Sequence, residues 1–143
     1  MGMAFLTNRS APTVTVETET ETSENTGVEM KLLWENAATA TAFAAQKLSL
    51  DLTGYSVLLT EYSYDSTEGK VHLSQIATNT VGDSYRLIFM SGNSSTTSYS
   101  QHRDIEIVED GLSVGGGYRT GSTNDAACSP RRIYGLKGVQ GRT

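Results

Sequence analysis

The chain has 143 residues and a formal net charge of −5, with 16 acidic against 11 basic side chains. This balance argues against a nucleic-acid partner held through its phosphates, and no apolar run approaches the ~20 residues that cross a bilayer, so we expect neither nucleic-acid binding nor membrane insertion. A single cysteine, Cys128, excludes an intramolecular disulfide, and we expect it to pack as a small apolar side chain. Abundant threonine, serine and glycine favour strands joined by turns.

The first 27 residues differ from the rest of the chain. Residues 3–6 are a short apolar hook, and residues 13–22 alternate threonine with valine or glutamate. This period of two favours an extended strand, but the segment has too little apolar surface to fold alone. We expect residues 1–27 to form an anchoring arm that lies along another protein as an added strand; the alternative is that it rests on its own domain. The apolar contacts of the arm are expected from Phe5, Leu6, Val14 and Val16.

Residues 28–143 have the pattern of one folded domain. Alternating apolar and polar positions, interrupted by turn signals rich in glycine, aspartate and serine, predict about eight strands. Their expected ranges are 28–34, 48–52, 55–64, 70–77, 84–90, 99–109, 112–118 and 132–139. Short strands at regular turn spacing are typical of an all-β sandwich, and we expect the jelly-roll type, with the arm extended from its N-terminal end.

Three of these strands carry further expectations. Residues 84–90 are apolar on both faces, which indicates a central strand. The strand at 112–118 contains Gly115, Gly116 and Gly117, which favour a bulge or the close approach of another backbone and lack the spacing of a phosphate loop. The closing strand at 132–139 is also apolar on both faces and should lie inside the sandwich or between it and a neighbour.

Residue types that carry chemistry are scattered along the chain. Acids beside turns, such as Asp65, Glu68 and Asp110, are expected to be solvated, and nothing places two carboxylates at the separation that a glycosidase needs. Two widely spaced histidines and one cysteine do not make a zinc site. We therefore expect no enzyme, no metal and no cofactor. Tyr99 and Tyr118 flank polar loops and are the candidates for contact with a ligand.

Basic residues gather near the end of the chain. They are Arg131, Arg132, Lys137 and Arg142, with no acid among them. Four charges are few for counterion-driven binding of an anionic partner, so we expect a solvated strand end or an ionic seam to a neighbouring subunit. On this interpretation Arg131 contributes little to stability.

Three motifs carry a resemblance to known proteins: WENA at 34–37, FAAQ at 43–46 and IYGLK at 133–137. Over residues 28–138 the chain resembles a family of small β-rich proteins and C-terminal domains of tailed bacteriophages and prophages. Members open with a Trp-Thr-Asn-like turn and a Phe-Ala-Ala-Gln segment, and close on an Ile-Tyr-Gly-Ile-Lys-like strand. These motifs are structural rather than catalytic.

The resemblance implies a virion structural protein, such as a tail fibre, a head fibre or a capsid-decoration protein. It would be assembled in the bacterial host cytoplasm and attached to other virion proteins through residues 1–27. The resemblance also implies a homo-oligomer, and a trimer is the expected form. The alternative function is a receptor-binding adhesin module that recognises host surface glycans. A glycan depolymerase is disfavoured by the missing catalytic constellation.

Overall fold

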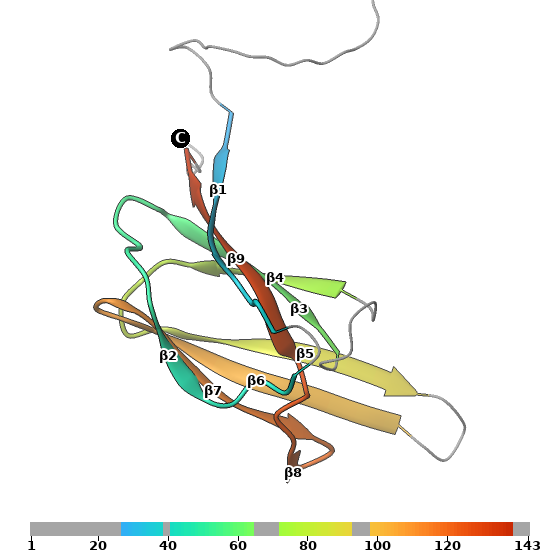
Figure 1. Ribbon diagram of the computed structural model, residues 1–143. Helices are drawn as coiled ribbons and strands as arrows, with labels where there is room; N and C mark the ends of the chain where they lie inside the picture. The colour runs from blue at the N-terminus through green and yellow to red at the C-terminus, as the bar shows by residue number, and fades with distance from the viewer. Residues whose placement is uncertain (1–26, 39–40, 65–71, 93–97, 139–143) are drawn as a thin grey trace, which may run out of the picture.

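The computed structural model describes residues 27–38, 41–64, 72–92 and 98–138. Within these ranges the chain forms strands and turns and no helix (Figure 1). The strands are β1 (Glu29–Glu35), β2 (Gln46–Ser49), β3 (Val57–Ser63), β4 (His72–Thr78), β5 (Ser84–Gly92), β6 (Ser98–Val108), β7 (Gly111–Arg119), β8 (Ser122–Thr123) and β9 (Ser129–Lys137). The expected all-β class is therefore confirmed.

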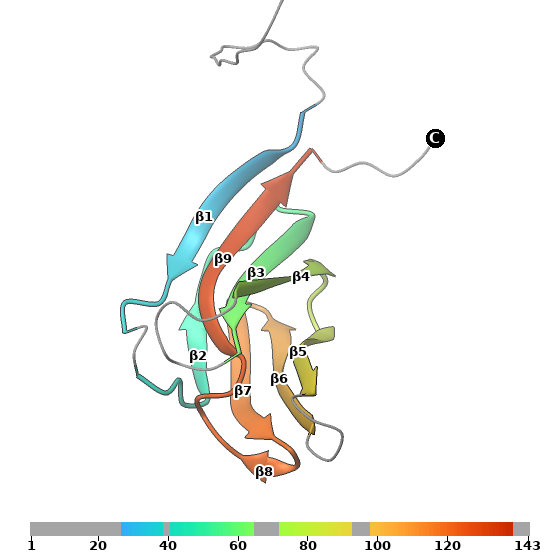
Figure 2. The ribbon, with the colours of Figure 1, turned by 90° about the vertical axis from the view of Figure 1, so that its right-hand side faces the viewer.

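The strands form two antiparallel sheets that pack as a β-sandwich, as expected (Figure 2). One sheet has four strands in the order β1-β9-β3-β4, and the other has the order β2-β7-β6-β5 with the short β8 added beside β7. Early strands pair with late ones, β1 with β9 and β2 with β7, a long-range pairing that jelly rolls also have. The hairpin β3-β4 and the meander β5-β6-β7 join strands that follow one another in the chain.

Two strand predictions need correction. β5 lies at the edge of its sheet, although its two apolar faces indicated a central strand. Its outward Ile88 and Met90 are 48% and 73% exposed, so its second apolar face is a surface. β2 was expected at 48–52 and lies at Gln46–Ser49. It pairs with the first residues of β7, where Ser49 faces Gly111, and the chain turns away after that pair.

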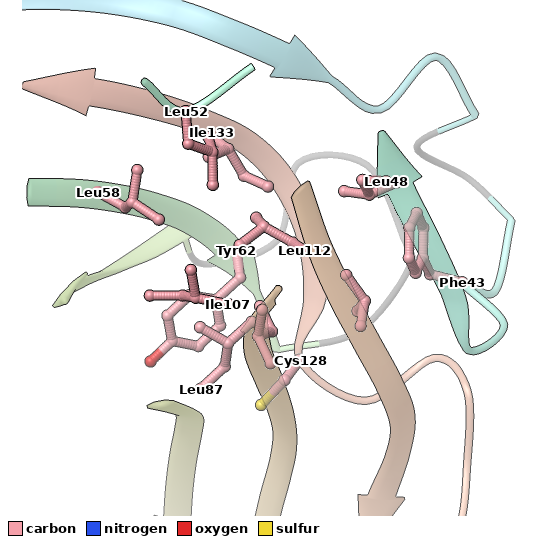
Figure 3. Packing of buried hydrophobic residues seen from close by; sticks show 12 residues of the cluster. Phe43, Leu48, Leu52, Leu58, Tyr62, Leu87, Ile107, Leu112, Cys128 and Ile133 are labelled. Carbon is pink, nitrogen blue, oxygen red and sulfur yellow. The ribbon is translucent and has the colours of Figure 1, made fainter. Parts of the chain in front are cut away.

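The core fills the space between the two sheets. Inward positions alternate with outward ones along β3, β6, β7 and β9, as the period of a strand requires. Figure 3 shows side chains from both sheets meeting in this space. The buried cluster comprises Phe43, Leu48, Leu52, Leu58, Tyr62, Leu87, Ile105, Ile107, Leu112, Val114, Cys128 and Ile133. Full burial of one such aliphatic side chain stabilises a fold by about 1.5–3 kcal/mol, so this cluster accounts for much of the driving force.

β9 occupies the middle of the four-stranded sheet, between β1 and β3. Ile133 is fully buried in the core, while Tyr134 points to the other face and is half-buried. At the start of this strand the interpretation of Arg131 as a solvated residue is wrong. Its side chain is 4% exposed, and its Nε donates to Ser63 Oγ at 2.9 Å. A buried guanidinium must be hydrogen-bonded, so Arg131 is part of the folded framework.

Arg103 on β6 is the largest fully buried side chain in the described part of the chain. It is in phase with Ile105 and Ile107, so the alternation of the strand directs it into the core. Its guanidinium donates at 2.7–3.1 Å to the backbone carbonyls of Phe43, Gly115, Asp125, Ala127 and Cys128. These dipoles compensate the desolvation of the cation, and we call the arrangement the carbonyl cage.

The glycine run of β7 makes room for the carbonyl cage. β6 advances by two residues from Arg103 to Ile105. The facing part of β7 advances by three, from Gly117 to Val114, so one residue bulges out of the pairing. A Cβ on Gly117 would lie 2.4 Å from the carbonyl oxygen of Asn124, so only glycine fits there. The bulge and the close backbone approach expected from the sequence are both confirmed.

Candidate functional site

The arm residues expected to contact a partner lie outside the described part of the chain. They are Phe5, Leu6, Val14 and Val16. In the sequence these residues precede β1, which is an edge strand of the four-stranded sheet.

Of the two tyrosines expected to face a ligand, Tyr118 is exposed on the outer surface of the five-stranded sheet. It lies on β7, is 41% exposed, and stacks on His102 of β6 with ring centroids 5.0 Å apart and 18° between the planes. Tyr99 lies on β6 opposite Ser91, but its side chain is outside the described part of the structure. Tyr118 thus belongs to a sheet face rather than to a loop.

The stacked pair belongs to a row of residues that crosses four strands. His102 faces Ile88 of β5 on one side and Tyr118 on the other. Tyr118 in turn faces Thr123 of β8. Directly opposed residues of antiparallel strands lie on the same face, so the four side chains form one continuous strip. We call this strip the aromatic row.

A charged pair borders the aromatic row on the same face. Arg86 donates through Nε and Nη2 to the two carboxylate oxygens of Asp104, at 2.6 and 2.9 Å. These hydrogen bonds hold the pKa of Asp104 below its ordinary value and raise the pKa of Arg86. Asp104 is therefore an ionised, occupied carboxylate, which makes it a poor general base.

The outer face of the four-stranded sheet is apolar over two cross-strand rows. These seven residues, which we call the apolar outer face, are Leu32, Tyr134, Leu59 and Ile76 in one row and Met30, Leu136 and Val57 in the next. Met30, Leu32 and Ile76 are 56%, 44% and 58% exposed, and the other four are half-buried. Isolated exposed apolar residues are ordinary, whereas a contiguous exposed apolar set is a candidate interaction surface.

A row of ion pairs borders the apolar outer face. Arg132 of β9 lies 3.0 Å from a carboxylate oxygen of Glu35 on β1 and 3.2 Å from one of Glu61 on β3. Its hydrogen bond to Glu61 and the nearby charge of Glu35 raise the pKa of Arg132. Lys137 lies over the ring of Tyr55, 5.0 Å from the centroid. These two cations thus have partners within their own chain, which weakens the interpretation of the basic stretch as an anion site.

Cys128 is free and fully buried beneath β6. Its backbone N–H donates to the side-chain oxygen of Gln101 at 3.1 Å. Burial raises the pKa of the thiol to about 12, so the thiol stays neutral near pH 7. A neutral buried thiol is a poor nucleophile, and the expected packing role is confirmed.

An open hollow of about 650 Å³ lies between the loop after β2 and the turn from β6 to β7. Of its acids, Asp110 is paired with Lys47, and Asp51 accepts from the backbone N–H of Thr53 at 3.1 Å. Nowhere in the described ranges do three His, Cys, Asp or Glu side chains gather closely enough to hold a metal ion. Those ranges also contain no helix long and apolar enough to cross a membrane. We assign the hollow no ligand.

Sequence reasoning does not find the apolar outer face. The alternation at the start of the domain marks Met30 and Leu32 as one side of a strand, and IYGLK marks Tyr134 and Leu136 as one side of another. Which side faces the core depends on the register between β1, β9 and β3, which a single sequence does not contain. The available signal was the closing strand, which is apolar on both faces and was expected inside the sandwich or between it and a neighbour.

Comparison with known proteins leaves the family open. No protein-family model matches the sequence, and no curated protein matches it. The functional argument therefore depends on the residues of this chain and on their arrangement.

Proposed function

We propose that the chain is a structural component of a bacteriophage virion, of the tail-fibre, head-fibre or capsid-decoration kind. Residues 1–27 attach it to other virion proteins, and the β-sandwich is displayed from that attachment. The phage context comes from the sequence resemblance described above. The single observation that supports an assembly role most strongly is the apolar outer face, because a soluble monomer rarely leaves such a contiguous strip open to water.

In the sequence, the proposed arm leads into β1 of the sheet that carries the apolar outer face. β1, which follows the arm directly, contributes Met30 and Leu32 to that face. On this proposal, one partner binds the arm as an added strand and also contacts the apolar outer face. This arrangement suits a permanent structural contact, because such interfaces are more apolar than the rest of a protein surface. The expected trimer stays a prediction.

Incorporation into particles tests this proposal. Tagged full-length protein, supplied to phage lacking its own copy, is expected to appear in purified virions, and the chain lacking residues 1–27 is expected to fold but stay out of them. Ile76→Asp, in the apolar outer face, is expected to lower the copy number per particle. Ile88→Asp is the matched control, because Ile88 is a similarly exposed isoleucine on an edge strand of the other sheet. Normal copy number for the truncated chain contradicts the proposal.

The second candidate function, a module that binds host surface glycans, is favoured by the aromatic row. An exposed tyrosine stacked on a histidine offers an apolar ring surface beside the charged pair of Arg86 and Asp104. Sugar rings pack on such surfaces, although most exposed aromatic residues have no ligand. Binding of the full chain to a glycan array, lost in Tyr118→Ala and kept in Tyr134→Ala, supports this function. Equal binding by both variants rejects the aromatic row as the site.

A further inference from the structure

β1 is an edge strand whose pattern is self-complementary. It borders β9 on one side, and no other described strand lies on its second side. Val28, Met30 and Leu32 are 53%, 56% and 44% exposed and project to one face. Glu29 and Lys31 alternate with them and are also exposed. An open edge with exposed apolar side chains is a template for pairing with another strand, and natural proteins usually cover or guard such edges.

We propose that two copies of this chain pair through β1, antiparallel about a two-fold axis at Met30. In this register Met30 lies opposite Met30 of the second copy, and Val28 lies opposite Leu32 of the second copy. Glu29 and Lys31 then oppose each other twice, once on each side of the axis. Directly opposed residues share a face, so the apolar contacts form on one face and the two ion pairs on the other.

The charges select this register among its neighbours. Centring the two-fold axis on Lys31 brings two lysines together and leaves Glu29 opposite Leu33. Centring it on Leu32 brings Glu29 opposite Glu35, and like charges directly opposite each other destabilise a sheet. Of these three registers, only the one about Met30 gives Glu29 and Lys31 an oppositely charged partner each. A two-fold contact of this kind uses the same patch on both copies, as isologous interfaces do.

The pairing extends the four-stranded sheet across both copies. Four strands from each copy give a continuous eight-stranded sheet with the two β1 strands at its centre. The apolar outer faces then lie side by side and form one larger strip. The opposite edge of the sheet, β4, offers no comparable pattern, because its exposed positions are His72, Ser74, Ile76 and Thr78. The charge complementarity therefore favours β1 as the contact.

Charge reversal tests the register. Glu29→Lys and Lys31→Glu each turn two attractive pairs into two repulsive ones, so each should raise the dimer dissociation constant about tenfold or more. The double variant restores opposite charges across the axis and should recover the affinity of the original chain. Glu106→Lys is the control, because it makes the same charge change on the outer face of the other sheet. Sedimentation equilibrium of the full-length chain measures all four, and circular dichroism checks that they fold.

Cross-linking supplies an independent measurement. Met30→Cys places two thiols directly across the axis, at a strand-pair separation that a disulfide can span, so mild oxidation should give a covalent dimer. Val28→Cys is the matched control on the same face. In the proposed register its two copies are offset by four residues, about 13 Å, which is beyond the reach of a disulfide. The native Cys128 is buried and should remain unlinked.

Several outcomes overturn the inference. A monomer at high micromolar concentration contradicts the proposed dimer. A trimer, the form expected from the resemblance, also contradicts it, because a two-fold contact yields even-numbered assemblies. A dimer that the charge variants leave unchanged, or one in which Val28→Cys cross-links as well as Met30→Cys, removes the register. The inference does not rest on the proposed virion function, so the incorporation test and the mass measurement succeed or fail separately.

Discussion

The two sheets of this sandwich differ most on their outer faces. Each buries an arginine on its inner face, Arg131 in the four-stranded sheet and Arg103 in the five-stranded one. The outer face of the four-stranded sheet carries two apolar cross-strand rows beside its ion pairs, whereas the described outer face of the five-stranded sheet carries the ion pair of Arg86 with Asp104 beside the aromatic row. The contrast teaches that alternation identifies the two faces of a strand but does not say which of them meets water.

The largest expected effect comes from the buried cation of the five-stranded sheet. Arg103→Met keeps an unbranched side chain but takes the Arg103 donor from the five carbonyls of the carbonyl cage, of which Asp125 keeps the backbone N–H of Phe43 as a donor. Each buried carbonyl left without a donor typically costs about 1–3 kcal/mol, so the loss of several donors should lower the free energy of unfolding by more than about 3 kcal/mol. Urea denaturation measures it. Arg86→Met is the control on the outer face of the same sheet; equal losses in the two variants would mean that the cage is not structural.

The inner face of the four-stranded sheet gives the next effect. Ile133 is fully buried between β1 and β3, and its truncation to alanine should lower the free energy of unfolding by about 2–5 kcal/mol. Ile76→Ala removes the same atoms from the outer face and should change the unfolding of the monomer little. Thermal unfolding at low protein concentration compares the two. A large loss from Ile76→Ala under these conditions indicates that the outer face packs within the monomer.

Arg131 should show a smaller but clear effect, contrary to the expectation from the sequence. Its guanidinium is buried and bonded to Ser63, so Arg131→Ala leaves a buried hydroxyl with one partner fewer and a cavity beside it. A loss of about 1–3 kcal/mol in the free energy of unfolding is expected. Arg132→Ala, on the outer face of the same strand, is the comparison and should lose less. Chemical denaturation measures the two losses of unfolding free energy, and a larger loss in Arg132→Ala than in Arg131→Ala contradicts this prediction.

Alkaline pH should lower the free energy of unfolding through two buried groups, Cys128 and Tyr85. Burial raises the pKa of Cys128 from 9.0 and that of Tyr85 from 10.0, in both cases to about 12. Both groups are therefore kept neutral by folding, so their contribution is complete below the unfolded pKa and is lost as the pH rises toward 12. The free energy of unfolding should decline from about pH 9 upward. Cys128→Ala should flatten the decline between pH 9 and 10, and Tyr85→Phe should flatten it above pH 10.

The smallest effect belongs to the charged outer face. The pKa of Asp104 is lowered by its hydrogen bonds to Arg86, so its contribution is present above the ordinary value of 3.8 and is lost as the pH falls through the folded value. Both side chains are about half exposed, and exposed ion pairs contribute little. Asp104→Asn should therefore leave the midpoint of urea unfolding nearly unchanged at pH 7. A marked loss there shows that the outer face of this sheet is as structural as its interior.

Local signals in the sequence predicted most of the strands and turns. Gly82 and Gly111 mark turns and adopt positive φ, and the glycine run correctly indicated the bulge in β7. Features that depend on pairing between distant strands could not be predicted in the same way. The edge position of β5, with Ile88 turned to solvent, and the apolar outer face both depend on which strands become neighbours, and pairing between distant strands leaves no local pattern.

The candidate site was predicted only in part. Tyr118 is exposed as expected, but its partner His102 lies 16 residues away along the chain, on the neighbouring strand. The burial of Arg103 was missed because an arginine is normally assigned to the surface. Its phase with Ile105 and its position opposite a glycine without a Cβ were the available signals. They become decisive only once the strand pairing is known.

The position of β9 has a consequence for the order in which the protein is made. The ribosome synthesises residues 129–137 after β1, β3 and β4, yet this strand separates β1 from β3 in the finished sheet. The hairpin β3-β4 and the meander β5-β6-β7 can form from neighbouring segments during translation, whereas β1 has no partner in its own sheet until β9 emerges. Sequence-distant pairings form slowly, and unpaired strands are prone to aggregate. The nascent chain therefore carries β1, with Met30 and Leu32, without a strand partner in its sheet for most of its synthesis.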